Sequence, residues 1–121
     1  MRSKILALSK NKEFKTLLKK KKVSNKYVTI FFGNLDKKNN KRLNISFVAK
    51  KKLGNAVKRN KIKRRLKNIM NDIIKNTSIN FSFSFLVIAK PTMLSNDYTN
   101  IKETLFQEFI KIKKWIFLPI L

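Results

Sequence analysis

The chain has 121 residues, of which 30 are Lys or Arg and six are Asp or Glu, so its formal net charge is +24. With 43% apolar residues it can build the core of a single domain over residues 1–121, although self-repulsion of this size favours a polyanionic partner. The absence of Cys and His excludes disulfides, thiolate metal sites and Ser-His or Cys-His nucleophiles. The six acids include no close pair typical of a metal-dependent nuclease, so we predict no catalytic residue and no metal site on the polypeptide.

The N-terminal part is predicted to form a short helix over residues 9–21. Ser9 is a suitable N-cap, and the lysine run 19–22 suits a helix C-terminus. Phe14 and Leu18 lie on one side of this helix. An aromatic residue at helical spacing fits a core position as well as a binding surface, so both roles are open for Phe14.

Two strands are predicted to follow the first helix. Residues 27–32, YVTIFF, are β-branched and aromatic, and alternation places Thr29 and Phe31 on the same face. Residues 33–42 form a polar connection of turn-forming residues. Residues 43–49 then alternate again and predict the second strand.

The most informative stretch is residues 53–67, LGNAVKRNKIKRRLK, which carries seven basic side chains and no acid. Asn55 can cap a helix that extends to about residue 75. The buried face of this helix would be formed by Ile62, Leu66, Ile69 and Ile73, which repeat at helical spacing. Since residues 37–71 contain no Asp or Glu, the cations have no acid nearby to pair with. A solvated face would mix both signs, so we expect this face to bind phosphate.

The remaining elements complete an α+β domain. Residues 81–89, FSFSFLVIA, change from alternation to a continuous apolar run, which predicts a central strand. A last helix over about residues 97–113 mixes acids and bases, as a packing element would. The apolar tail 115–121 is too short to span a bilayer and is expected to pack onto the sheet, with a partner contact as the alternative. The element order α-β-β-α-β-α thus predicts a small, mainly antiparallel sheet with helices packed on it.

Lys50, Lys51 and the pattern Ala56-Val57-x-Arg59-Asn60-x-x-Lys63-Arg64 resemble the signature of the bacterial ribonuclease P protein component. The resemblance extends over about residues 8–112. It implies a left-handed strand-helix-strand crossover, against the general right-handed preference. It also implies a subunit of an endoribonuclease that binds ribonuclease P RNA and precursor tRNA and assists removal of the 5′ leader. Because residues 5–8 are too short an apolar run for a signal peptide and no stretch is long enough to span a membrane, we expect a cytoplasmic protein. The catalytic centre and its Mg²⁺ would belong to the RNA subunit.

The resemblance also assigns two groups of site residues. The catalytic RNA would be bound by Lys51, Arg59, Asn60, Lys63, Arg64, Arg65 and Lys67. The leader would lie in a cleft formed by Phe14, Leu18, Phe31 and Lys26. The chain departs from the family at Leu18, where a second Phe is frequent, and at Lys67, where Arg is usual. A point-charge contact therefore replaces a bidentate phosphate contact at Lys67.

Two other functions fit parts of the sequence. A basic ribosomal protein with a structural role fits the charge but not the spacing over residues 56–64, and it would co-purify with ribosomal subunits. A cationic membrane-binding protein would require the apolar stripe of the basic helix to face lipid, and it would bind anionic vesicles. We predict neither a membrane nor a DNA partner.

Overall fold

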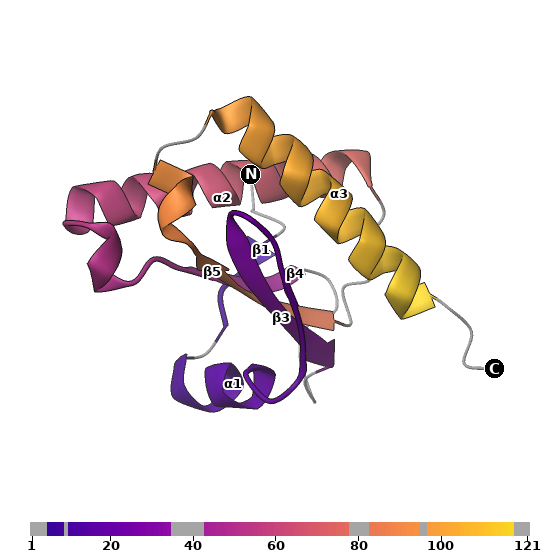
Figure 1. The fold of residues 1–121 in the computed structure, drawn as a ribbon. Helices are drawn as coiled ribbons and strands as arrows, with labels where there is room; N and C mark the ends of the chain where they lie inside the picture. Colours follow the sequence, from indigo (N-terminus) through magenta and orange to yellow (C-terminus); the bar gives the residue numbers. More distant parts are fainter. Residues whose placement is uncertain (1–4, 9, 35–42, 78–82, 95–96, 118–121) are drawn as a thin grey trace.

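The computed structural model describes residues 5–8, 10–34, 43–77, 83–94 and 97–117 (Figure 1). The α-helices are α1 (Lys10–Leu17), α2 (Ala56–Asn76) and α3 (Tyr98–Phe117). The strands are β1 (Ile5–Leu6), β2 (Lys21–Ser24), β3 (Val28–Asn34), β4 (Leu43–Val48) and β5 (Phe83–Ala89). Two short 3-10 helices, η1 (Lys51–Leu53) and η2 (Pro91–Leu94), precede α2 and α3.

Within these residues the strands form one sheet in the order β1-β4-β5-β3-β2. β5 is the central strand, as its apolar run predicted; it pairs parallel with β4 and antiparallel with β3. The α+β class and the order of the six expected elements are confirmed, and β1 and β2 are additional. The sheet is mixed, with the longer part of its register antiparallel. β4, α2 and β5 form the expected crossover unit, whose left-handed sense stays a prediction from the resemblance.

The first helix is shorter than predicted. α1 ends at Leu17, and the amides of Lys19 and Lys20 donate to carbonyls of the last helical turn. The next lysines, Lys21 and Lys22, belong to β2, which pairs antiparallel with β3. Lysine has low strand propensity, so this edge strand is decided by its pairing with β3 and not by local preference. The expected cap Ser9 lies outside the described residues.

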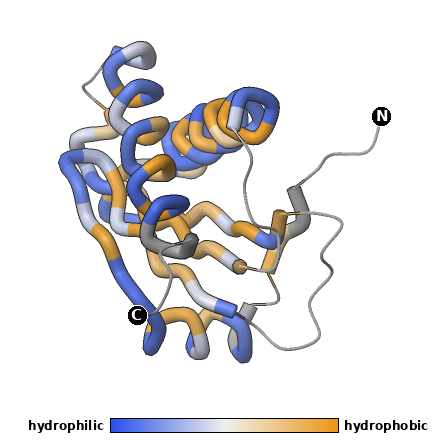
Figure 2. The backbone as a smooth tube through the Cα atoms, turned by 90° about the vertical axis from the view of Figure 1, so that its right-hand side faces the viewer, coloured by the Kyte–Doolittle hydropathy of each residue, from blue (hydrophilic) through white to orange (hydrophobic). Residues whose placement is uncertain are grey.

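Helices cover both faces of the sheet, with α2 and α3 on one face and α1 on the other (Figure 1). The strands between them are largely apolar (Figure 2). The larger core lies under α2 and α3. It buries the predicted stripe of α2, formed by Ile62, Leu66, Ile69 and Ile73, and the apolar face of α3, formed by Ile101, Leu105, Phe109 and Ile112. The smaller core lies under α1 and consists of Leu8, Leu17 and Leu86.

The start of α2 is defined by two residues. Asn55 caps the helix as predicted, because its side-chain oxygen accepts a 3.0 Å hydrogen bond from the amide of Lys58. Gly54 precedes it with a φ of 132°, a region that favours glycine. These residues fix the point where the chain leaves η1 and becomes the basic helix.

An ion pair joins α2 to α3 above the sheet. The Nζ of Lys102 lies 2.8 Å from a carboxylate oxygen of Asp72. The hydrogen bond from Lys102 lowers the pKa of Asp72 below its ordinary value and raises that of Lys102. α3 extends to Phe117, beyond its predicted end, while the side chains of the tail 115–121 lie outside the described part of the chain.

Candidate nucleic-acid interface

The cations of α2 lie on two flanks of the helix, one on each side of its buried apolar stripe. Lys63 and Lys67, one turn apart and both exposed, lie on the flank beside β4, where they line a common pocket with that strand. Asn60 and Arg64 are exposed on the same side, and with Val57 and Lys63 they line a shallow pocket of about 430 Å³. We call Asn60, Lys63, Arg64 and Lys67 the β4 flank.

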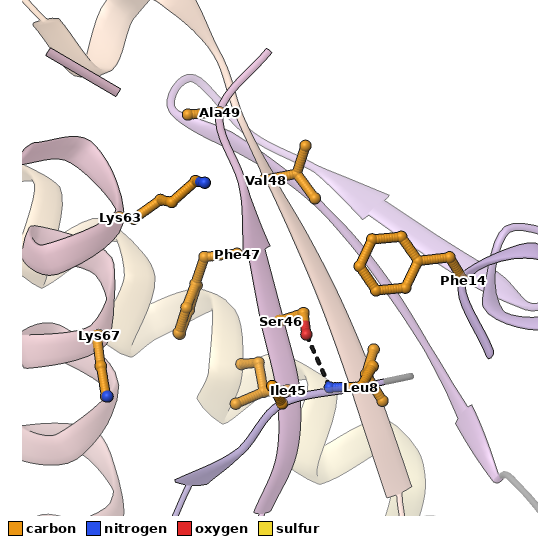
Figure 3. Close-up of a pocket in the computed structure, with 10 residues that line it drawn as sticks. Leu8, Phe14, Ile45, Ser46, Phe47, Val48, Ala49, Lys63 and Lys67 are labelled. Atoms are coloured by element: carbon orange, nitrogen blue, oxygen red, sulfur yellow. Dashed lines mark hydrogen bonds between the residues drawn. The ribbon is translucent and has the colours of Figure 1, made fainter. Parts of the chain in front are cut away.

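A second pocket, of about 460 Å³, extends along β4 from this flank. It is lined by Ala7, Leu8, Phe14, Ile45, Ser46, Phe47, Val48, Ala49, Lys63 and Lys67. In Figure 3, β4 runs between the two lysines of α2 on one side and Phe14 of α1 on the other. We call this space the edge pocket. Because it contains Lys63 as well as Phe14, it joins the β4 flank to the face of the sheet under α1.

The edge pocket exists because β1 is short. Among the described residues, β1 pairs with Leu43 and Asn44, at the beginning of β4. Farther along, the amide of Leu8 donates a 2.8 Å hydrogen bond to Ser46 Oγ (Figure 3). The chain then continues to α1, so the later part of β4 borders the pocket.

The sheet face under α1 carries the predicted aromatic residues. Phe14 and Phe31 are half-buried and pack against the smaller core, together with Val48 and Ile88. Register places Lys22 opposite Phe31 on the neighbouring strand, which puts both side chains on this face. The Nζ of Lys22 lies 6.0 Å from the centroid of the Phe31 ring. We call this half-buried surface, with Lys22 at its border, the α1 face.

Two residues predicted for the leader cleft, Leu18 and Lys26, do not lie with Phe14 and Phe31. Leu18 is 48% exposed and is not among the buried or half-buried side chains of the smaller core. Lys26 lies in the turn between β2 and β3, where its Nζ is 5.6 Å from the centroid of the Tyr27 ring. Tyr27 belongs to the larger core and precedes Phe31 by about 13 Å of extended chain. The structure therefore places Lys22, and not Lys26, beside the α1 face.

Lys22 was missed because the sequence pattern assigned it to the end of the first helix. A helical residue at that position would have no fixed relation to Phe31. The available signal was the alternation of residues 21–24 (KKVS), in which Val23 is half-buried between exposed residues. The run of four lysines, residues 19–22, obscured that alternation.

The remaining predicted contacts lie around α2. Lys51 is exposed in η1, and its carbonyl accepts a 3.1 Å hydrogen bond from the amide of Gly54, close to the start of the helix. Arg59 is half-buried, and its Nε is buried without a hydrogen-bond partner among the described residues. Arg65 lies on the other flank of α2, in a pocket with Met93 and Leu94 of η2. The structure thus separates Arg65 from Lys63 and Lys67.

The described residues contain no group of three or more His, Cys, Asp or Glu side chains that could hold a metal ion. None of the described helices is long and apolar enough to cross a membrane. The apolar stripe of α2 is buried against the sheet and α3, which removes the surface that a membrane-binding role for this helix would need.

The sequence is similar to known proteins over most of its length. A family model described as Ribonuclease P matches residues 3–113. The ribonuclease P protein component of Mesoplasma florum is 31% identical over 107 residues, which cover 88% of this chain and 94% of that protein. That of Bacillus cereus is 30% identical over 103 residues, covering 84% and 86%.

Solved structures agree in fold. The RNase P protein of Staphylococcus aureus superposes with a TM-score of 0.73 at 27% identity, covering 89% of this chain and 94% of that chain. The RNase P protein of Thermotoga maritima gives a TM-score of 0.70 at 22% identity, covering 84% and 93%, which is a likeness of fold.

Proposed function

This chain belongs to the ribonuclease P protein family, and we propose that it binds its RNA subunit and the 5′ leader of precursor tRNA on two adjoining surfaces. Membership of this family makes the chain a subunit of an endoribonuclease, with ribonuclease P RNA as its partner. The alternative of a structural ribosomal protein is therefore set aside. In our proposal the RNA holds the catalytic centre and its Mg²⁺. The sequence supports this division, because it has no His or Cys and only six scattered acids.

The ribonuclease P RNA would bind along the β4 flank of α2. Asn60, Lys63, Arg64 and Lys67 are exposed there, and Lys51 and Arg59 lie near the first turns of the same helix. Cations of this density, in a stretch (residues 37–71) without Asp or Glu, are suited to a phosphate backbone, where they release condensed counterions. The Nε of Arg59, which is buried and has no hydrogen-bond partner within the described part of the chain, is a donor that a bound phosphate oxygen could satisfy.

The leader would lie on the α1 face. Phe14 and Phe31 offer half-buried rings on which unpaired bases can stack, and Lys22 can neutralise a neighbouring phosphate. Apolar Val48 and Ile88 extend the surface toward β4. A single strand needs this combination of rings and cations, and no base-specific hydrogen bonding is required.

One observation carries the proposal: the edge pocket is lined by Lys63 and Lys67 of the β4 flank and also by Phe14 of the α1 face. The two surfaces are therefore neighbours around a single strand, β4. A leader held on the α1 face would come close to an RNA docked on α2. This arrangement would let the protein position a leader relative to a catalytic RNA.

The test compares two precursor tRNAs, one with a long leader and one with a single leader nucleotide. Each is cleaved by a bacterial ribonuclease P RNA at low Mg²⁺, with and without the protein. We expect accurate 5′ cleavage that requires the protein. Phe14→Ala should weaken binding of the long-leader substrate by about 5- to 150-fold, the equivalent of ~1–3 kcal/mol of base stacking, and leave the short-leader substrate unaffected.

Arg59→Ala with Arg64→Ala provides the complementary variant, because it should weaken assembly with the RNA for both substrates equally. Equal effects of Phe14→Ala on the two substrates would overturn the leader assignment. A wild-type protein that binds RNA without stimulating cleavage would overturn the proposal as a whole. A cytoplasmic location is part of the same proposal, since tRNA transcripts are processed there in bacteria.

A further inference from the structure

A pocket on the other flank of α2 is not used by the function proposed above. It measures about 250 Å³ and lies between α2 and η2. Its lining consists of Lys58, Lys61, Ile62, Arg65, Met93 and Leu94. We call it the η2 pocket. It combines three cations with three apolar side chains and contains no carboxylate.

The apolar wall of this pocket is held by buried anchors. Met93 is fully buried, and its amide donates a 3.0 Å hydrogen bond to the carbonyl of Lys90. The amide of Lys90 in turn donates to Tyr27, and its Nζ donates to Ser24 Oγ at 2.6 Å. These hydrogen bonds join η2 and the residue before it to the hairpin of β2 and β3. Leu94, the next residue, is held in place and is nevertheless 45% exposed.

The cations of the η2 pocket follow from the helix period. Lys58, Lys61 and Arg65 are separated by three and four residues, so they form one stripe beside the buried Ile62. This stripe lies across the buried face from Lys63 and Lys67. The nearest acids in sequence are Asp36 and Asp72, both well outside the span of the stripe.

A ligand for this pocket must be anionic and must present a flat apolar surface. The cations require negative charge at the rim, while Leu94 and Ile62 require an apolar group between them. A nucleotide meets both requirements, because its phosphates are charged and its base has an apolar face. The volume is slightly below the ~300 Å³ at which drug-sized pockets begin, which suits one base.

We propose that the η2 pocket binds one unstacked nucleotide of the ribonuclease P RNA, with its base against Leu94 and its phosphates on Lys58, Lys61 and Arg65. This inference rests on the proposed function, since it takes the ribonuclease P RNA as the partner of α2. The RNA would then contact α2 from both flanks. Arg65, which is separated from the β4 flank, would contact the RNA through the η2 pocket.

The test uses the full chain and measures its affinity for ribonuclease P RNA over a range of salt concentrations. Leu94→Ser should weaken binding about tenfold, equivalent to ~1.4 kcal/mol, without changing the slope of log K against log salt, because no phosphate contact is lost. Leu94→Phe should tighten binding, because a ring stacks on a base better than an aliphatic side chain does. Chemical probing should show one nucleotide protected by the wild type and exposed with Leu94→Ser.

The matched control is Ile110→Ser on α3, since Ile110 is 39% exposed and does not line the pocket. Melting temperatures of both variants exclude unfolding as the cause. If Leu94→Ser and Ile110→Ser bind the RNA equally well while the wild type still stimulates cleavage, the inference is overturned and the proposed function stands. A wild-type protein that does not stimulate cleavage would overturn the proposed function itself.

Discussion

Removing the two lysines of the edge pocket tests the docking face quantitatively. In the double variant Lys63→Ala with Lys67→Ala, two exposed cations on consecutive turns of α2 are lost. Both side chains are exposed and the apolar stripe is untouched, so the free energy of unfolding should change little. The affinity for ribonuclease P RNA should fall and should become less sensitive to salt.

The size of this effect follows from counterion release. Each phosphate contact contributes about 0.7–0.9 to the slope of log K against log salt, so losing two contacts lowers the slope by about 1.4–1.8. A rise from 50 to 200 mM salt is fourfold. Over that range, the advantage of the wild type over the double variant should therefore shrink by about 7- to 12-fold.

The assay is equilibrium binding of ribonuclease P RNA at four or more salt concentrations. The control is Lys111→Ala with Lys114→Ala, which removes two exposed lysines from one side of α3 and lowers the net charge equally. Our reasoning requires the control to keep the wild-type slope. If both double variants lose the same slope, then net charge and not the edge pocket determines affinity, and the docking face is refuted.

Three further predictions concern stability. Asn55→Ala should lower the free energy of unfolding in urea by about 1 kcal/mol, because the amide of Lys58 loses its capping acceptor. Leu17→Ala should cost about 2–5 kcal/mol and speed amide exchange in α1 more than in α2, since Leu17 is fully buried in the smaller core. Asp72→Asn should lower the melting temperature at neutral pH. This difference should vanish as the pH falls below 3.8, because the hydrogen bond from Lys102 holds the folded pKa of Asp72 below that ordinary value and its contribution is lost on protonation. A difference that persists at lower pH would show that the ion pair is not its source.

Elements with local signals could be predicted from the sequence. The stripe Ile62, Leu66, Ile69, Ile73 and the cap Asn55 are where the pattern placed them, because both depend on residues within one or two helical turns. The central position of β5 followed from its apolar run, since only a strand covered on both faces tolerates one. The same periodicity placed Lys63 and Lys67 on the exposed side of α2.

Relations between distant segments could not be predicted in this way. The lysine run 19–22 suits a helix C-terminus and gives no strand signal, and only the pairing of β2 with β3 places Lys22 beside Phe31. The sequence groups Arg65 with Lys63 because both lie on the basic helix. Only the position of η2 beside Arg65 reveals that the two residues border different pockets. The sequence by itself determined which side chains of each element face inward, because that choice is set by the helix and strand periods. The tertiary structure alone decided which exposed cations share a pocket with which rings, because packing brings together residues that no local period relates.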